Sequence, residues 1–403
     1  MQSHTGRFAS VKPLTPVLLT SLFLLFLIAV GSKPAQAQTY QVIHNFTNKG
    51  TDGADPYGGP ILDHSGNLYG TTYLGGKYGA GSVYSLSPNG SSWTYTSLHS
   101  FRGQSDGSGP GFGSLAMGPN HALFGTTEGG GYFGTAFAVC SCPSGEVIVH
   151  SFGTGTDGAQ PLGGLAFDSA GNSYGTTSLG GAYDNGTVFE ITRAGVESVI
   201  YSFTGGNDGF NPVSGVTVDG QGNLYGTTSL GGANGDGVVF KLSPSGSGWT
   251  ETVLYTFQGL DDGQNPTGGV ILDKAGNVYG STFFGGADGG GTVYELSPSG
   301  ATWTFTTLYS FSTYYGPYNK LTLDAKGNLY GTTNGAGANG LGSVFKLTHS
   351  SSGWTFTDLY DFPGGNEGGL PYGSVAVDSN GNIFGTATIG GSDNQGVIFE
   401  ITP

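Results

Sequence analysis

The stretch DGQGNLYGTTSLGG, residues 219–232, decides the fold, because variants of it return along most of the chain. Its core is DxxGN followed by an apolar residue, an aromatic residue and glycine. Six full copies of this core begin at Asp63, Asp168, Asp219, Asp273, Asp324 and Asp378. A seventh, degenerate copy, GPNHALFGTT (residues 118–127), lacks the Asp and the GN. The aromatic residues of successive copies lie 50 to 55 residues apart, which indicates seven tandem units.

Each unit contains four short runs with strand character. In the fourth unit these runs are SGVTVD (214–219), NLYGTT (223–228), GVVFKL (237–242) and WTETVLYTF (249–257). Alternating β-branched and aromatic residues between Gly, Asp, Asn and Pro are typical of strands and hairpins, and no segment after residue 37 keeps a helical period. Four strands in about 50 residues favour an all-β fold, a β-propeller of four-stranded blades, over a β-helix.

The two ends of the repeat region complement each other. The last unit stops after its third strand, at GVIFEITP (396–403), while QTYQVIHNF (38–46) aligns with the fourth-strand sequence WTETVLYTF. An N-terminal strand that completes the last blade closes the ring, whereas an open solenoid leaves unpaired edges that invite aggregation. We therefore expect a seven-bladed propeller that is closed by its N-terminal strand.

The first 37 residues differ from the rest. Arg7 and Lys12 precede the apolar run VLLTSLFLLFLIAV (17–30), and Ala35 and Ala37 then supply the small residues of a signal-peptidase site. We predict a signal peptide at 1–37, a single repeat domain at 38–403, and no stable membrane span after cleavage. The protein would then be secreted or held in the periplasm or cell envelope. The alternative is an uncleaved N-terminal anchor, since a span of about 18 residues can be drawn there.

Charge and cysteine content exclude several classes of partner. The formal net charge of -15 becomes -18 once Arg7, Lys12 and Lys33 are removed with the leader, which argues against nucleic acid as a partner. Cys140 and Cys142 are spaced at the edge of disulfide reach within a strand, so no disulfide framework is expected. Two thiols without a second pair are also poor evidence for a zinc site.

The repeat resembles a known family. GNLYGTT, a GG-rich loop, GVVFKL, a terminal LYSF or LYTF and then GGNDGxNP recur in this order. This combination is similar to the GloVer-type tandem repeat of bacterial exported proteins, a choice-of-anchor family, and the resemblance covers residues 39–403. The resemblance implies export and a repeat fold, with no established reaction. Because the chain ends at ITP, we do not expect a hydrophobic C-terminal anchor.

The recurrent residues have a structural explanation. Asp and Asn side chains bond nearby backbone N–H groups, and Gly tolerates positive φ, so DxxGN is predicted to be a tight hairpin turn. A residue type that most repeats need sets the fold rather than performing chemistry. We expect the aromatic residue of LYG to pack between neighbouring sheets and its Gly to admit a close backbone approach.

Propeller topology places a set of acidic loops on one face, together with the GG loops. The acids are Asp52, Asp106, Asp157, Asp208, Asp262 and Glu367. Calcium prefers such oxygen ligands and is the alternative, but one acid per loop followed by Gly fits a solvated, Asp-stabilised turn better. We therefore predict no metal site.

Catalytic and cofactor motifs are missing or misplaced. GGGYFG (129–134) and GAGANG (335–340) match GxGxxG but lead into strands, whereas a dinucleotide site opens a helix. HExxH, GxSxG and the phosphate-binding GxxxxGK[ST] are absent from the sequence. We predict no catalytic residue and no cofactor. His44 and His99 take the tyrosine position of LYSF, which favours strand packing.

The repeat breaks most clearly in the sixth acidic loop. FSTYYGPYNK (311–320) stands where the fourth unit begins with FTGGNDGFNP (203–212). The predicted binding residues are Tyr314, Tyr315, Tyr318 and Lys320 of this loop, together with Glu367, which replaces the Asp of the other units. Exposed tyrosines stack on sugar rings or anchor a protein partner. The alternative is a locally repacked loop.

These observations favour an exported, non-enzymatic binding or scaffold protein. It would recognise a glycan, a peptide or a cell-surface protein through one loop face of the propeller. The alternative is a carbohydrate-active hydrolase or lyase with an acid pair in the propeller funnel, since such a pair performs general acid and base catalysis.

Overall fold

The structure is a computed structural model that describes residues 1–2, 38–140, 145–153, 155–312 and 315–403. The chain divides into two units, Met1–Ala37 and Gln38–Pro403. The predicted signal peptide falls almost wholly outside the described residues. No helix in the described part of the chain is long and apolar enough to cross a membrane.

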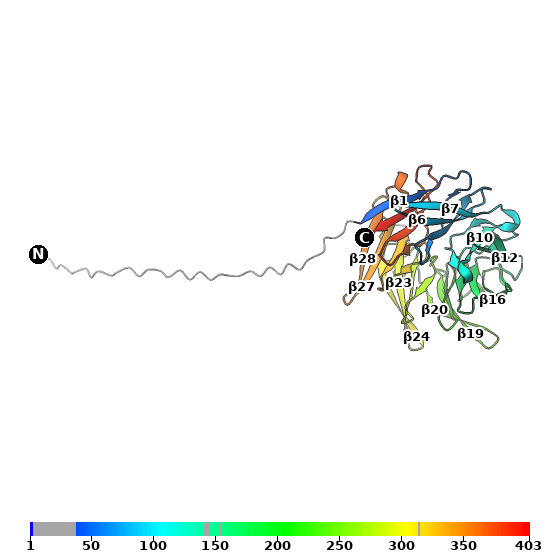
Figure 1. The fold of residues 1–403 in the computed structure, drawn as a ribbon. Helices are drawn as coiled ribbons and strands as arrows, with labels where there is room; N and C mark the ends of the chain where they lie inside the picture. Colours follow the sequence, from blue (N-terminus) through cyan, green and yellow to red (C-terminus); the bar gives the residue numbers. More distant parts are fainter. Residues whose placement is uncertain (3–37, 141–144, 154, 313–314) are drawn as a thin grey trace. The chain divides into compact units, whose positions relative to one another are not determined.

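The second unit is a ring of seven small antiparallel sheets, which are the blades of a β-propeller (Figure 1). Blade 1 consists of β3 (Ile61–Leu62), β4 (Leu68–Thr72), β6 (Ser82–Asn89) and β7 (Ser92–Ser100). Blade 2 consists of β8 (Ser108–Pro110), β9 (Ala116–Met117), β10 (Leu123–Gly129), β11 (Thr135–Val139) and β12 (Glu146–Ser151). Blade 3 consists of β13 (Ala166–Phe167), β14 (Ser173–Thr177), β15 (Thr187–Ile191) and β16 (Glu197–Ser202). Blade 4 consists of β17 (Thr217–Val218), β18 (Leu224–Thr228), β19 (Val238–Ser245) and β20 (Gly248–Thr256).

The remaining blades follow the same order from the inner to the outer strand. Blade 5 consists of β21 (Val270–Leu272), β22 (Val278–Thr282), β23 (Thr292–Ser299) and β24 (Thr302–Ser310). Blade 6 consists of β25 (Thr322–Leu323), β26 (Leu329–Thr333), β27 (Ser343–Ser350) and β28 (Gly353–Asp361). Blade 7 consists of β29 (Ala376–Val377), β30 (Ile383–Ala387), β31 (Val397–Thr402) and β1 (Thr39–Asn45). The loops add the pair β2 (Gly53–Ala54) and β5 (Leu74–Gly75) and the 3-10 turns η1 (Gln104–Asp106), η2 (Pro119–His121) and η3 (Gly365–Glu367).

The N-terminal strand closes the ring, as the sequence predicts. β1 pairs antiparallel with β31, with Thr39 opposite Thr402 and Asn45 opposite Val397. In Figure 1 the blue strand β1 lies beside the C-terminal end of the chain. The fourth strand of blade 7 therefore comes from the opposite end of the domain, and no outer edge is left open at the seam.

The innermost strands are shorter than the predicted runs of about six residues. Each is paired over two or three residues, as in β17 and β21, because the preceding residues pack against the neighbouring inner segment instead of forming a ladder. A Cβ atom added at Gly59 would lie 1.9 Å from the Ser374 oxygen, and one added at Gly113 would lie 2.0 Å from the Gly164 nitrogen. Glycine at these two neighbouring positions of the inner segment lets the segments of adjacent blades meet around the axis.

The DxxGN turn has the structural role that the sequence predicts. In the fourth unit Asp219 Oδ1 accepts hydrogen bonds from the backbone N–H groups of Gln221 and Asn223, at 2.8 and 2.9 Å. Asp219 Oδ2 accepts from Asn223 Nδ2 and from the Tyr225 hydroxyl. Burial raises the pKa of Asp219, but these hydrogen bonds outweigh it and hold the pKa below its ordinary value. The carboxylate is fully used in the turn.

The LYG element confirms one expectation and corrects another. Tyr225 is buried between blades 4 and 5 with Val270 and Val278, so the aromatic residue does pack between sheets. The glycine does not admit a neighbouring backbone. A Cβ atom at Gly226 would lie 2.5 Å from the ring of Phe240, so this glycine makes room for the large aromatic side chain of the next strand. Packing of a side chain, rather than approach of a main chain, excludes a larger residue here.

Blade 2 departs most from the repeat in its backbone. The turn η2 replaces the DxxGN hairpin, and Asn120 in it has a φ of 58°. Cys140, directly after β11, is disulfide-bonded, while Cys142 lies outside the described residues. These differences lie next to the first two interfaces between blades.

Candidate functional site

The inner segments of all seven blades surround a central cavity of about 530 Å³. Its wall is formed by small and aliphatic side chains and by the backbone of the Gly-rich segments. Its rim includes Phe112 and Tyr318, and one cationic side chain, Lys320, lies in its wall. We call this space the central channel.

Four aromatic rings form one connected group, and two of them, Phe112 and Tyr318, line the central channel. Tyr57, Phe112, Tyr318 and Tyr372 each stand six residues before the turn position of their blade, in blades 1, 2, 6 and 7. Because the ring is closed, these four blades are consecutive. Ring centroids are separated by 4.8 Å for Tyr57 and Phe112, 5.1 Å for Tyr57 and Tyr372, 5.4 Å for Tyr318 and Tyr372, and 5.8 Å for Phe112 and Tyr318. We call these four residues the aromatic collar.

The other three blades have no aromatic residue at this position of the repeat. Blades 3, 4 and 5 carry Leu162, Val213 and Thr267 there. The collar is therefore a property of one half of the ring and not of the repeat. Aromatic rings with centroids 4.5 to 7 Å apart attract one another, and all four collar residues are only partly buried.

Lys320 stands in the channel wall where every other blade has a small residue. The equivalent residues of the other blades are glycine or serine: Gly59, Ser114, Gly164, Gly215, Gly269 and Ser374. The Lys320 side chain reaches from blade 6 to blade 4, where Nζ donates a hydrogen bond of 2.7 Å to Thr217 Oγ1. Thr217 Oγ1 in turn donates to the Val270 carbonyl oxygen.

The charge of Lys320 is not balanced within the channel. No carboxylate of the described residues forms an ion pair with its ammonium within 4.0 Å, and the described residues that line the channel include no Asp or Glu. Burial lowers the pKa of Lys320 to about 8, because the channel wall removes the ammonium from bulk water. Because the Lys320 ammonium has no carboxylate partner among the described residues, it should attract an anionic ligand.

The structure brings only part of the predicted binding set together. Tyr318 belongs to the collar and Lys320 lies below it, both in the inner segment of blade 6. Tyr315 is 51 % exposed and packs on Phe283, whose ring also meets Tyr318 at 5.3 Å. Tyr314 lies outside the described residues.

Glu367 lies apart from this group, in η3 at the end of the outer strand β28. Its carboxylate accepts a hydrogen bond from the Tyr360 hydroxyl, and its carbonyl oxygen accepts one from the Tyr40 hydroxyl. Glu367 therefore contacts the seam between blades 6 and 7 rather than the channel.

Sequence reasoning missed Tyr57, Phe112 and Tyr372. Their signal was present, because an aromatic residue opens the inner segment in four blades. These blades become neighbours only when blade 7 is joined to blade 1. Counting along the chain separates them into two distant groups.

The acidic loops close on themselves, which confirms their predicted role in turns. The Asp208 carboxylate accepts a 2.7 Å hydrogen bond from Thr204 N, and Asp262 accepts one of 2.9 Å from Gln258 N. Their second contacts are the outer-strand tyrosines Tyr201 and Tyr255, at 3.0 and 2.8 Å. These acids are not the solvated groups that the sequence suggested, because the outer strand partly covers them, and Asp208 is 8 % exposed.

Comparison with known proteins places the chain in a family and a fold. The model of the Gloeobacter/Verrucomicrobia repeat matches residues 32–232 and 215–403, so the chain belongs to this repeat family. No curated protein sequence matches the chain.

Solved structures resemble the chain in fold alone. A fungal alcohol oxidase of the AA5 family, in complex with copper, aligns with a TM-score of 0.58 and 12 % identity over 91 % of this chain and 77 % of its own. A gluconolactonase from Xanthomonas campestris gives a TM-score of 0.42 and 13 % identity over 70 % and 82 %. The PQQ-bound aldose sugar dehydrogenase from Streptomyces coelicolor gives 0.46 and 12 % over 91 % and 98 %. At these identities the likeness says nothing of activity.

Proposed function

We propose that this member of the Gloeobacter/Verrucomicrobia repeat family is an exported binding protein whose central channel takes a carboxylate-bearing saccharide. One observation carries the proposal: the uncompensated ammonium of Lys320 lies in the channel next to a collar of aromatic rings. The signal-like first 37 residues support export.

The chemistry of the two parts matches one class of ligand. The Lys320 ammonium has three N–H groups and gives one of them to Thr217, so the others can donate to a carboxylate, and a charged hydrogen bond is about twice as strong as a neutral one. Tyrosine and phenylalanine faces pack on the apolar faces of sugar rings. A peptide carboxylate would satisfy Lys320 equally well, but the collar offers rings rather than the strand edge or groove that peptide recognition uses.

The overall charge of the protein does not prevent this binding. The formal charge of -15 repels an anion at a distance, but salt screens exposed charges beyond about 8 Å at physiological ionic strength. Inside the channel the nearest charge is the Lys320 ammonium. The Lys320 ammonium, rather than the net charge of the protein, therefore determines whether the channel attracts an anion.

The alternative function, a hydrolase or lyase with an acid pair in the funnel, needs two carboxylates 5 to 10 Å apart. The carboxylates described above lie in turns and at the outer strands, where each is bonded to backbone or to a neighbouring side chain. No observation in the channel favours the enzyme. Incubating the protein with the saccharides below and assaying for new reducing ends separates turnover from binding.

The test is calorimetric titration of the purified protein with oligogalacturonides and, as neutral counterparts, their methyl esters. We expect the acid to bind and its ester to bind at least about tenfold more weakly, since an ionic hydrogen bond contributes about 1.5 to 3 kcal/mol. Equal affinity for acid and ester, or no affinity for either, would reject the proposal.

The matched variant is Lys320→Ser, because serine is the natural residue at this position in blades 2 and 7. It should fold as the wild type does and lose about tenfold or more in affinity for the acid alone. Affinity of the wild type should also fall as pH rises through about 8, where the free ammonium loses its proton. Lys320→Ser should lack this pH dependence.

A further inference from the structure

Neighbouring blades touch through an equivalent pair of outer-strand positions all around the ring. The first position is a His or Tyr of one blade, and the second belongs to the outer strand of the next blade. At four interfaces an aromatic ring at the second position stacks on the first. The stacked pairs are Tyr40 on Tyr360, Tyr95 on His44, Phe305 on Tyr255 and Phe356 on Tyr309, with centroids 3.9, 4.3, 4.2 and 4.0 Å apart. We call these the ring-stacked interfaces.

At the other three interfaces a glutamate takes the place of the ring. The residues are Glu146, Glu197 and Glu251, in the outer strands of blades 2, 3 and 4. Strand register shows that the positions are the same, because Glu146 lies opposite Val139 and Glu251 lies opposite Leu242, just as Phe305 lies opposite Leu296. We call these the glutamate interfaces. A carboxylate therefore stands at the position where four sister blades have a partly buried aromatic ring.

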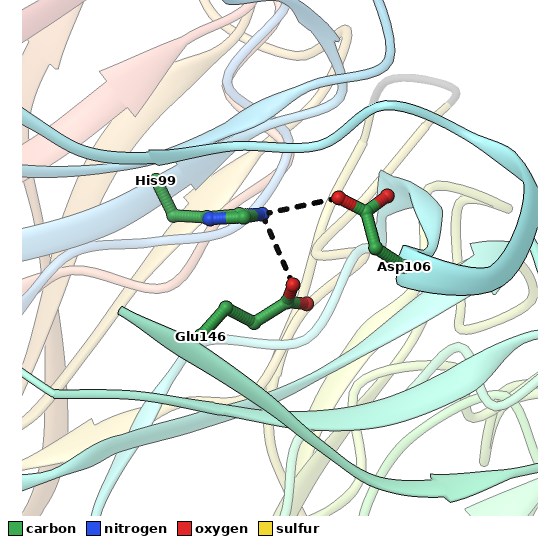
Figure 2. A group of neighbouring side chains, drawn as sticks. All are labelled: His99, Asp106 and Glu146. Atoms are coloured by element: carbon green, nitrogen blue, oxygen red, sulfur yellow. Dashed lines mark ion pairs between the residues drawn. The ribbon is translucent and has the colours of Figure 1, made fainter. Parts of the chain in front are cut away.

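Three metal-binding side chains converge at the interface between blades 1 and 2. Figure 2 shows His99 of β7, Asp106 of η1 and Glu146 of β12 pointing toward one another. His99 Nε2 lies 3.6 Å from Asp106 Oδ2 and 3.3 Å from Glu146 Oε2. One ligand atom from each of the three side chains lies within 4.8 Å of the other two.

Asp106 Oδ1 accepts a hydrogen bond of 2.8 Å from the Arg102 backbone N–H, but two other polar atoms of this group are not satisfied. The Glu146 side chain is 9 % exposed, and its Oε1 has no hydrogen-bond partner among the described residues. His99 Nε2 is buried and likewise makes no hydrogen bond to them. Burying carboxylates without hydrogen bonds or a cation costs several kcal/mol per group, so buried charges are normally paired or bound to a metal. His99 Nε2 faces both carboxylates, through Glu146 Oε2 and Asp106 Oδ2 (Figure 2).

We propose that His99, Asp106 and Glu146 bind a divalent transition-metal ion of the zinc type between blades 1 and 2. Two ligands each about 2.0 to 2.2 Å from a tetrahedral zinc are about 3.3 to 3.6 Å apart, which is the spacing of the His99 nitrogen from the two carboxylate oxygens. One imidazole and two carboxylates leave the fourth position to water. Calcium is disfavoured, because it takes six to eight oxygen ligands.

The same arrangement recurs one blade further on. His150 of β12, Asp157 and Glu197 of β16 form the second group, and His150 Nε2 lies 3.0 Å from Asp157 Oδ1. Glu197 Oε1 again has no hydrogen-bond partner in the part of the chain that the structure describes. Each ion would join two blades, because the histidine belongs to the outer strand of one blade, the aspartate to the loop after it, and the glutamate to the outer strand of the next blade.

Two other interfaces hold two of the three ligand types and serve as natural controls. Between blades 7 and 1, His44 and Asp52 are 3.1 Å apart, but Tyr95 stands where the glutamate would be. Between blades 3 and 4, Asp208 and Glu251 are present, but Tyr201 stands where the histidine would be. Neither offers three ligands.

The experiment titrates Zn²⁺ into the purified protein after removal of metals with a chelator. We expect two equivalents to bind, and a melting temperature that rises by about 3 °C or more when zinc is in large excess over its dissociation constant. His99→Tyr should remove one equivalent, and His99→Tyr with His150→Tyr should remove both. Tyrosine is the natural residue of this position in four blades, so these variants should fold.

The matched control is His44→Tyr, which should leave both equivalents in place. Glu146→Gln should weaken one equivalent by about tenfold or more while keeping the side-chain shape. Co²⁺ in place of zinc should show the absorption of a four-coordinate site, which His99→Tyr with His150→Tyr abolishes. Failure to bind zinc, or binding that survives the double variant, overturns the proposal. Lys320→Ser should not change zinc binding, so this test is independent of the channel.

Discussion

The interfaces between blades 4 and 5 and between blades 3 and 4 are built on one plan and differ in one side chain. At the first, Phe305 stacks on Tyr255 at 4.2 Å, and at the second, Glu251 stands at the same register beside Tyr201 and Asp208. Burial raises the pKa of Glu251 to about 7, and the nearby charge of Asp208 raises it further. The ring-stacked interface contributes to stability, whereas the glutamate interface costs stability unless something else uses the carboxylate. A residue that a repeat keeps at a cost marks a candidate site.

The largest effect should come from breaking the seam, where two ring-stacked interfaces share one strand. Deleting residues 38–46 removes β1 and with it both Tyr40 and His44. Blade 7 then loses its outer ladder, and the melting temperature should fall by more than about 10 °C. Deleting Gln38 alone is the control. A melting temperature unchanged by the longer deletion would refute closure by β1.

A second change converts a ring-stacked interface into a glutamate interface. Phe305→Glu removes the stack on Tyr255 and adds a charge beside Asp262. Phe305 is partly buried, so losing its stacked ring should cost about 1 to 3 kcal/mol of unfolding free energy, less than for a fully buried phenylalanine, and the charge should add to this at pH 8. Urea unfolding measures the difference, with Phe305→Leu as the uncharged control. Wild-type stability in Phe305→Glu at pH 8 would show that ring and carboxylate are interchangeable here.

The third change relieves a glutamate interface that has no histidine. The folded-state pKa of Glu251 is raised from its ordinary 4.5 to about 7, so its proton stabilises the folded state below pH 4.5, and this contribution is lost as pH rises through 7. Glu251→Gln avoids the loss. It should be more stable than the wild type by about 1 to 2 kcal/mol at pH 8 and nearly equal to it at pH 5. A destabilised variant at pH 8 would mean that the carboxylate is satisfied.

The smallest change in stability should accompany Tyr201→His, which completes the third glutamate interface with the missing ligand. Without metal it should cost about 1 kcal/mol, because the hydrogen bond from Tyr201 to Asp208 is lost. With zinc it should raise the number of bound equivalents from two to three. Tyr255→His is the control, since its neighbour is Phe305 and not a glutamate. A third equivalent in both variants would show that histidine alone suffices.

Local sequence predicted the elements of the fold well, because their determinants lie within a few residues. Asp219, Asn223 and Tyr225 close their turn over seven positions, and every full copy repeats this spacing. The number of residues in each inner strand that join the ladder was less predictable. Whether the residues before β17 join a ladder depends on how closely the next inner segment approaches, and a single unit does not contain that information.

The candidate sites were predictable only in part, for the same reason. Lys320 and Tyr318 stand out because they replace residues that the repeat keeps small or aliphatic, but their place in the channel follows from the arrangement of all seven blades. The sequence predicts that His44 and His99 lie in strands, and both do. Glu146 and Glu197 each belong to the blade after that of the neighbouring histidine and carry no motif of their own.

The sequence by itself determined the period, the number of blades, the turn chemistry and the joining of the two ends, since hydrogen bonding and side-chain alternation act over short distances and repeat with the chain. Only the tertiary structure decided which side chains meet. Closing the ring brings Tyr372 beside Tyr57, and packing blade against blade brings Glu146 to His99, although neither pair is near in sequence. Contacts between units depend on the geometry of the whole ring, and that is why the channel and the glutamate interfaces emerge at this level alone.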